Sequence, residues 1–207
     1  MEVRISNNQV TIEGYVNAVE RNSKPLWSRI GKFIERITKG AFTKALERND
    51  DVQILLNHDD SRVLGSQKQG NLELYEDSIG LHAKAVIRDD QVVRDAREGN
   101  LVGWSFGFYD TPDGVERAVE NGMPVRIVHD LDLKEVSILN REKSPAYEGT
   151  LIMARDDETA MYYGGISDDQ VTVREEQEQP KEEPKQDDPV AIDYSHFEQL
   201  ISDMKGE

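Results

Sequence analysis

Residues 125–139 carry the sequence VRIVHDLDLKEVSIL, in which apolar and polar side chains alternate. A period of two is typical of a β-strand with one buried face. Leu131 and Leu133 then lie on one face, and the charged residues between and beside them lie on the other. By the same parity His129 and Glu135 share the leucine face, an assignment that holds only if the strand has no bulge. We therefore expect a carboxylate that faces inward at Glu135.

Further segments of the chain show the same short apolar runs between turn signals. Strands are predicted at residues 10–16, 52–56, 72–75, 81–87 and 106–109. Helices are predicted at residues 41–48 and 90–98, the second closed by Gly99 as a C-terminal cap. Many strands, few scattered helices and no regular alternation of the two predict a mainly β fold of the α+β class. We expect a β-barrel or sandwich that carries peripheral helices.

The composition changes near residue 155, which divides the chain into an expected domain at 1–155 and an acidic tail at 156–207. The tail holds 16 acidic and 4 basic residues, so it contributes 12 of the 16 net negative charges. Residues 174–189 contain no apolar residue except three prolines, which predicts a flexible linker. Apolar residues at roughly helical spacing over 192–204 predict a short amphipathic helix at the end of the tail.

Charge and composition also limit the partners. So acidic a chain is repelled by phosphate backbones and by anionic lipid surfaces, which argues against nucleic-acid and membrane partners. No apolar run approaches the roughly 20 residues that span a bilayer, and the N-terminus lacks the layout of a signal peptide. The absence of cysteine excludes disulfides, thiolate zinc sites and a cysteine nucleophile. We expect a soluble, intracellular protein.

Two motifs supply a nucleophile and a base. Residues 55–59, LLNHD, place His58 at the end of an apolar run, and residues 103–107, GWSFG, place Ser105 between two glycines. A serine hydroxyl is a poor nucleophile until a neighbouring imidazole takes its proton, so the pair is a candidate for acyl transfer. Each motif also has a plain structural reading: Ser105 as a small residue in a packed strand, and His58 as a histidine that ends a strand.

The GWSFG segment formally matches the nucleophile elbow of the α/β-hydrolases. That elbow needs a helix directly after the serine, followed in the chain by the acid and then the histidine. Here residues 106–109 predict a strand and residues 111–114 a turn, while the histidine precedes the serine. We therefore do not expect an α/β-hydrolase.

A third residue is needed to orient the imidazole of His58 and to stabilise its charged form. Glu135 is the first candidate, because an inward-facing carboxylate is costly unless a cation or imidazole pairs with it. His129 is the second candidate, since it shares the same inferred face. The alternative for Glu135 is an ion pair with Arg126 or Arg141.

The chain resembles the prohead serine proteases of tailed bacteriophages, a family related in fold to the herpesvirus assemblins. The resemblance covers about residues 10–152 and is carried by motifs in the family's order: EGY (13–15), GAF (40–42), LLNHD (55–59), RVLG (62–65), GL (80–81), SFGF (105–108), LKEVS (133–137) and PAYEGT (145–150). It implies a closed or partly closed β-barrel of the assemblin type. It also implies a serine endopeptidase in the host cell cytoplasm, inside the assembling procapsid, which cleaves scaffold or the scaffold-like segment of the major capsid protein and also itself.

Residue by residue, the resemblance makes Ser105 the nucleophile and His58 the general base. The phage motif makes Glu135 the third member, whereas the herpesvirus relatives use a second histidine, which keeps His129 open. No cofactor or metal is implied, and the oligomeric state stays open. A non-enzymatic assembly scaffold built on an inactive protease barrel is the competing function, although such a relic is expected to have lost the serine and the histidine. An esterase is a third option.

Overall fold

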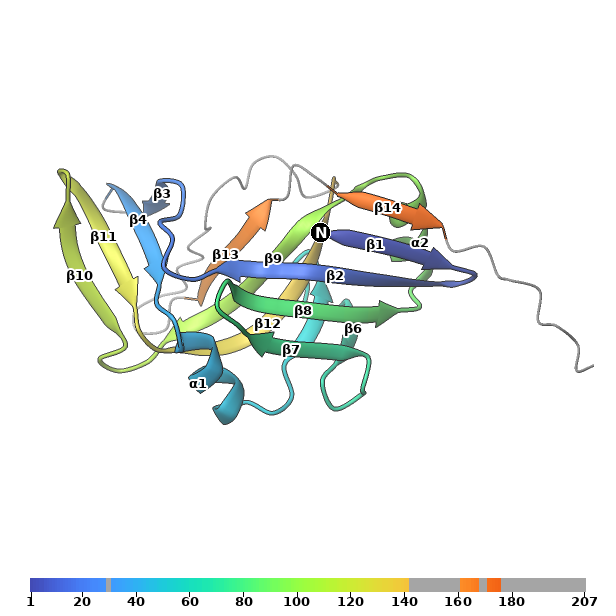
Figure 1. The fold of residues 1–207 in the computed structure, drawn as a ribbon, viewed down its shortest axis with the longest axis horizontal. Coiled ribbons are helices and arrows are strands. Elements are labelled where there is room, and N and C mark those ends of the chain that lie inside the picture. Colours follow the sequence, from blue (N-terminus) through green and yellow to red (C-terminus); the bar gives the residue numbers. More distant parts are fainter. Residues whose placement is uncertain (29–30, 142–160, 168–170, 176–207) are drawn as a thin grey trace, which may run out of the picture. The chain divides into compact units, whose positions relative to one another are not determined.

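The structure is a computed structural model that describes residues 1–28, 31–141, 161–167 and 171–175. The described residues form three β-sheets and two helices (Figure 1). The N-terminal sheet has the order β14 (Thr172–Glu175), β1 (Glu2–Ser6), β2 (Gln9–Ala18), β8 (Gly80–Ile87) and β7 (Leu72–Glu76). The β9 sheet has the order β13 (Met161–Ser167), β9 (Leu101–Asp110), β12 (Leu131–Asn140), β5 (Gln53–Leu56) and β6 (Val63–Ser66). The small sheet has the order β10 (Val115–Glu120), β11 (Met123–Val128), β4 (Gly31–Ile37) and β3 (Leu26–Ser28).

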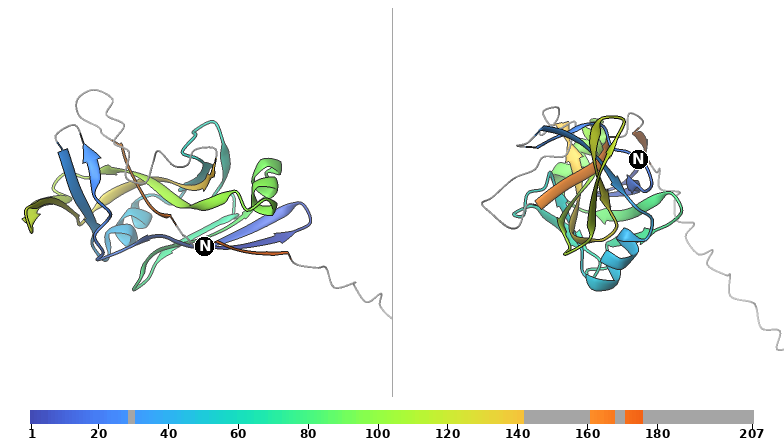
Figure 2. Two further views of the ribbon diagram at one scale, coloured as in Figure 1. Left: turned by 90° about the horizontal axis from the view of Figure 1, so that it is seen from above. Right: turned by 90° about the vertical axis from the view of Figure 1, so that its left-hand side faces the viewer.

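The main core lies between the N-terminal sheet and the β9 sheet. In Figure 2 the β1–β2 hairpin of the first sheet and strand β9 of the second form separate layers. Alternate residues of β1 and β2 face this core, and Trp104, Phe106 and Phe108 of β9 face it from the other side. Because side chains alternate along a strand, Ser105 and its flanking glycines lie on the opposite, outer face of β9. The core thus holds β9 in place and leaves the serine on the far side.

The two helices cover the ends of this core. Helix α1 (Ala41–Arg48) has the predicted bounds and packs Phe42 against Phe106, with ring centroids 5.3 Å apart in an edge-to-face arrangement. Helix α2 (Asp90–Arg97) is one residue shorter than predicted. The side chain of Asp89 caps its N-terminus by accepting hydrogen bonds from two backbone N–H groups. Gly99 adopts a φ of 66°, the left-handed conformation expected after a helix end.

The prediction of one strand over residues 125–139 was wrong in two respects. First, β11 ends at Val128 and β12 begins at Leu131, and the two strands belong to different sheets. The backbone N–H groups of His129 and Asp130 both point to the carbonyl oxygen of Gly114, which turns the chain between the sheets. His129 is therefore exposed and does not share a buried face with Glu135.

Second, β12 contains a bulge between Leu133 and Glu135, where two residues lie opposite Gly107 of β9. Before the bulge Leu133 pairs with Phe108, and after it Val136 pairs with Phe106, so the core face changes from odd to even residues. Glu135 is buried, with 3% of its surface exposed, but it lies on the face of Ser105 and not on that of the leucines. The predicted burial was right and its reason was wrong.

Strand pairing continues beyond residue 155, the expected end of the domain. Strand β13 pairs with β9, and β14 pairs with β1 in a parallel register that includes Arg174 and Glu175 of the predicted linker. The first compact unit of the chain extends from Met1 to Gln177. Residues 192–204, for which a helix was predicted, lie outside the described residues, as does the PAYEGT motif at 145–150.

The α+β class is confirmed, with strands as the dominant element. Strand pairing within the described ranges gives three open sheets and does not close into a ring, so the closed barrel remains a prediction. Neither described helix combines the length and the apolar character that crossing a membrane requires.

Candidate active site

Ser105 lies in the middle of β9, on its outer face. Its neighbours on that face along the strand are Gly103 and Gly107, so no side chain stands beside the hydroxyl in either direction. The residue is 6% exposed. The tight packing of Trp104 and Phe106 on the other face holds the backbone that carries Ser105. This placement puts Ser105 on a rigid strand, with no side chain beside its hydroxyl along that strand.

His58 follows β5 in a turn with unusual backbone angles. Asn57 and His58 have φ values of 57° and 58°, both in the left-handed region that non-glycine residues rarely adopt. The backbone N–H of Asn57 donates to the carbonyl oxygen of Ile138 at 2.9 Å, which ties the turn to β12. Two consecutive left-handed residues redirect the chain at the end of β5 and bring the imidazole over β9. The sequence motif contains this turn but gives no sign of its geometry.

The imidazole of His58 joins the other two candidate residues. Its Nε2 lies 2.8 Å from Oγ of Ser105, and its Nδ1 lies 2.8 Å from Oε1 of Glu135. With the carboxylate of Glu135 as acceptor, the assigned tautomer has its proton on Nδ1, and Nε2 presents its lone pair to the hydroxyl. This tautomer is the one in which histidine can take a proton from serine. The structure thus brings together Ser105, His58 and Glu135, three residues from three different elements.

Ser137 holds the carboxylate of Glu135 from the other side. Its Oγ donates a hydrogen bond of 2.6 Å to Oε2 of Glu135 and accepts one of 3.1 Å from the backbone N–H of His58. Ser137 is fully buried and lies directly opposite Ser105 in the strand pairing. The sequence alone assigned Ser137 no role, although its position two residues after Glu135 on the same strand face was a usable signal.

A buried polar chain supports the turn of His58. The side-chain amide of Asn57 forms two hydrogen bonds with Asn140. Its Nδ2 donates to Oδ1 of Asn140 at 2.7 Å, and its Oδ1 accepts from the backbone N–H of Asn140 at 3.0 Å. Nδ2 of Asn140 donates to Asp95 of α2 at 2.8 Å. At the other end of the turn, Arg62 forms an ion pair of 3.0 Å with Asp89, the cap of the same helix. Helix α2 therefore anchors both ends of the turn, a contact that the sequence alone did not predict.

The competing assignments lie elsewhere in the structure. His129 is in the small-sheet region, where its Nδ1 lies 3.3 Å from Oγ1 of Thr38 and its Nε2 lies 3.3 Å from Oε2 of Glu116. Arg126 binds Glu35 and makes a bidentate pair with Asp110. The two oxygens of Glu135 are engaged by His58 and Ser137 instead. The predicted strand and turn after Ser105 are present, so no helix follows it as an α/β-hydrolase elbow requires.

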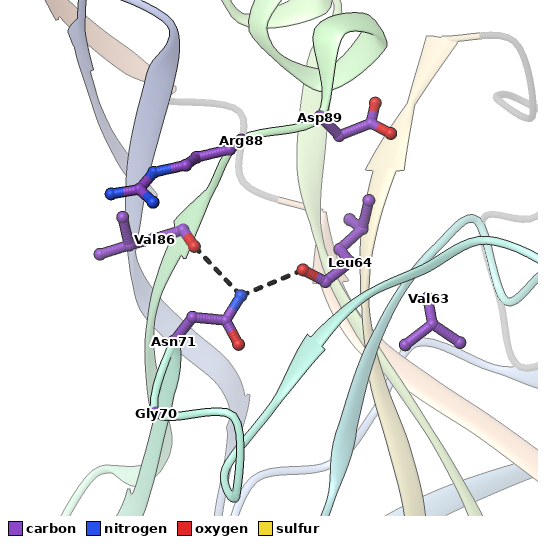
Figure 3. A pocket seen from close by; sticks show the side chains of 7 residues that line it. All are labelled: Val63, Leu64, Gly70, Asn71, Val86, Arg88 and Asp89. Atoms are coloured by element: carbon purple, nitrogen blue, oxygen red, sulfur yellow. Dashed lines mark hydrogen bonds between the residues drawn. The ribbon is translucent and has the colours of Figure 1, made fainter.

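A separate pocket of about 580 Å³ lies between β6 and the loop that joins β8 to α2 (Figure 3). Within it, Nδ2 of Asn71 donates to the carbonyl oxygens of Leu64 and Val86 and so links the two large sheets. None of the three candidate catalytic residues lines this pocket. Its central polar group already has partners, so we assign the pocket a structural role. Among the described residues no cluster of His, Asp and Glu is arranged to hold a metal ion.

The arrangement has the parts of an acyl-transfer centre: a hydroxyl nucleophile, a base within hydrogen-bond distance and a carboxylate that orients the base. Oxyanion donors are commonly backbone N–H groups.

Comparison with known protein families gives a match over most of the chain. The model of the family described as caudovirus prohead serine protease matches residues 1–162 of the chain. This range contains Ser105, His58 and Glu135 and most of the strands of both large sheets. No curated protein and no solved structure matches the chain.

Proposed function

Because this chain belongs to the caudovirus prohead serine protease family, a family of phage capsid maturation enzymes, we propose that it cleaves peptide bonds with Ser105, His58 and Glu135 as its catalytic residues. The observation that carries this proposal is the position of His58, whose two ring nitrogens each lie 2.8 Å from one of the other two side chains. The stability of the fold alone does not explain why three side chains from three separate elements form this hydrogen-bonded series.

In the proposed mechanism Oγ of Ser105 attacks the scissile carbonyl carbon while Nε2 of His58 takes the hydroxyl proton. Glu135 stabilises the imidazolium that forms. His58 then delivers the proton to the departing amine, which leaves an ester between Ser105 and the substrate's acyl group. Water activated by His58 hydrolyses that ester and restores the enzyme.

Membership in the family supports a role in phage capsid maturation, and we propose that the enzyme acts inside the assembling procapsid in the host cytoplasm. We propose that its substrates are the scaffold protein, or the scaffold-like segment of the major capsid protein, and the protease itself. We further propose that the strands complete an assemblin-type barrel in the active enzyme. A non-enzymatic assembly scaffold is the competing function. The intact hydrogen-bonded chain at His58 argues against it, since a scaffold needs no activated serine.

The acidic segment that follows β14 is proposed to recruit the enzyme. Residues 176–207 are acidic and proline-rich, and they end in a stretch with apolar residues at helical spacing. A linker followed by an amphipathic helix suits docking of the helix in an apolar groove of a partner. Scaffold or capsid protein is the expected partner, because a maturation protease must be packaged before it acts.

Co-expression with the phage's own scaffold and major capsid proteins tests the proposed activity. The wild-type chain should produce defined fragments of one of these proteins, and Ser105→Ala should produce none. Ser61→Ala is the matched control, since Ser61 is exposed and its backbone N–H and hydroxyl both donate to the neighbouring side chain of Asp59. Equal fragments from the wild type and Ser105→Ala would show that another residue, or another enzyme, performs the cleavage.

A further inference from the structure

Strand β13 lies directly beside the nucleophile. It pairs with β9 in antiparallel register, with Gly165 opposite Ser105 and Gly164 opposite Phe106. Among the described strands β13 is the edge of its sheet, and β12 is the other neighbour of β9. The family match ends at residue 162, so the Gly164–Gly165 bond and all that follows lie beyond the matched part of the chain. An extended segment of the chain itself thus occupies the place next to the reactive serine.

The contact between the two strands involves the reactive atoms. Oγ of Ser105 donates a hydrogen bond of 2.8 Å to the carbonyl oxygen of Gly164, the carbonyl of the peptide bond that joins Gly164 to Gly165. A C=O bond is about 1.23 Å long, so the carbonyl carbon is at most about 4 Å from this oxygen. Reacting atoms in a near-attack arrangement are about 3–3.5 Å apart. A shift of about 1 Å or less separates the observed contact from attack.

The hydroxyl proton of Ser105 has two acceptors in this arrangement. Nε2 of His58 and the carbonyl oxygen of Gly164 are each 2.8 Å from Oγ. When the proton points to Gly164 the serine is not activated, and when it points to His58 the oxygen is free to attack the nearby carbonyl. The contact is therefore compatible with a bound peptide that is cleaved slowly.

Glycine at position 164 is required for this close approach. A Cβ atom added at Gly164 would lie 2.7 Å from Cε1 and 2.8 Å from Cζ of Phe106. Phe106 is fully buried and cannot move aside cheaply, so any larger residue would push β13 away from β9. The pair of glycines presents bare backbone to Ser105, as a substrate with small residues at its scissile bond would.

We propose that β13 is a substrate held in cis and that Ser105 cleaves the peptide bond between Gly164 and Gly165. The inference rests on the proposed function and names its first substrate. A bond forms between Oγ of Ser105 and the carbonyl carbon of Gly164, and the C–N bond to Gly165 breaks. His58 carries the serine proton to the new amine of Gly165, and water then releases the carboxylate of Gly164. The products are residues 1–164, which contain the whole family match, and residues 165–207, which carry most of the tail's negative charge.

This placement also affects other substrates. While β13 is paired with β9, no second peptide can take the same position beside Ser105. Cleavage between Gly164 and Gly165 frees the end of the strand and opens that position. The class of substrate that fits is an extended segment with two small residues at the scissile bond.

Intact-mass measurement of the purified full-length chain tests this inference. The wild type should yield fragments 1–164 and 165–207, and Ser105→Ala should yield neither. Gly164→Ala should slow this self-cleavage about 100-fold, the cost of displacing reacting groups by about 1 Å. The wild type should cleave a synthetic peptide of residues 158–171 only after a lag, while its own Gly164–Gly165 bond is being cut, and Gly164→Ala should cleave this peptide without that lag because its β13 is displaced from β9. Thr172→Ala, an exposed change in the other edge strand β14, should alter neither rate.

Three results would overturn the inference, and they separate it from the proposed function. If a fluorophosphonate labels Ser105 and capsid protein is cleaved while the Gly164–Gly165 bond stays intact, the enzyme is a protease and β13 is not its substrate. If Gly164→Ala loses peptide cleavage as well as self-cleavage, β13 is a structural part of the active site and not its substrate. If neither labelling nor cleavage of any protein occurs, the proposed function fails together with the inference.

Discussion

Replacing Glu135 by glutamine tests the third member of the proposed triad without changing its shape. The carboxylate is 3% exposed and lies 2.8 Å from Nδ1 of His58, so its charge acts in a poorly screened environment. For charge centres about 4 Å apart at an effective dielectric constant of about 20, the attraction to the imidazolium is about 4 kcal/mol. Losing it should slow proton transfer about 10³-fold.

The hydroxyl of Ser137 is expected to make the loss larger. It donates to Oε2 of Glu135, so in Glu135→Gln it should keep the amide oxygen on its own side and turn the amide N–H₂ toward His58. Nδ1 of His58 must then accept, which moves the ring proton to Nε2 and removes the base that Ser105 needs. A wrong tautomer of this kind costs about 10⁴-fold in a Ser-His-Asp triad.

The double variant Glu135→Gln with Ser137→Ala separates charge from tautomer. Without the hydroxyl the amide is free to present its oxygen to Nδ1, so part of the activity lost in Glu135→Gln should return. His129→Gln is the control, since that side chain is exposed and about 0.5 kcal/mol, or a change of about twofold, is the expected limit. The assay is the initial rate of cleavage of purified capsid-protein precursor. A larger loss in His129→Gln than in Glu135→Gln would refute the assignment and move the third role to His129.

Three further predictions concern stability and packaging. Burial raises the pKa of Glu35 from its ordinary value of 4.5 to about 7, and Arg126 opposes the shift. The protonated Glu35 side chain therefore contributes fully to stability below about pH 4.5, and this contribution is lost as the pH rises through about 7. The free energy of unfolding measured in denaturant should therefore fall by roughly 2–3 kcal/mol from this group between pH 5 and 8, and Glu35→Gln should remove that fall; an unchanged slope would contradict the buried titration. Asn140→Ala should lower the free energy of unfolding by about 3 kcal/mol, because it removes the acceptor of Nδ2 of Asn57 and the donor to the buried carboxylate of Asp95, and a change below about 1 kcal/mol would show that these two hydrogen bonds contribute little to stability. Deleting residues 176–207 should leave peptide cleavage unchanged but reduce the enzyme recovered in procapsids, and equal packaging would exclude the docking role.

The catalytic candidates could be predicted from sequence because their motifs are local. His58 ends an apolar run, Ser105 sits between two glycines, and both features depend on residues within two or three positions. Helix α1 was predictable to the residue for the same reason, since its apolar spacing and flanking glycine are contained in the segment itself.

The supporting contacts could not be predicted because they join segments far apart in the chain. The bulge in β12 depends on how Gly107 pairs across the sheet, and no feature of residues 131–140 alone requires it. Asn57 and Asn140 are 83 positions apart, so their exchange of hydrogen bonds follows only from the parallel pairing of β12 with β5. The pairing of β13 with β9 is similar, because it adds a segment of the acidic region to the sheet through backbone groups that any sequence carries.

The most direct test of the proposed nucleophile and base is fluorophosphonate labelling of the full-length chain. It measures which residue forms the adduct and how fast the adduct forms. Such reagents react with a serine hydroxyl only when a base has activated it, so the measurement needs no knowledge of the substrate. Peptide mapping should find the adduct on Ser105, and His58→Ala should slow its formation about 100- to 10,000-fold, the usual contribution of a positioned base. An adduct on another residue, or an unchanged rate in His58→Ala, would contradict the assignment of Ser105 and His58 as nucleophile and base.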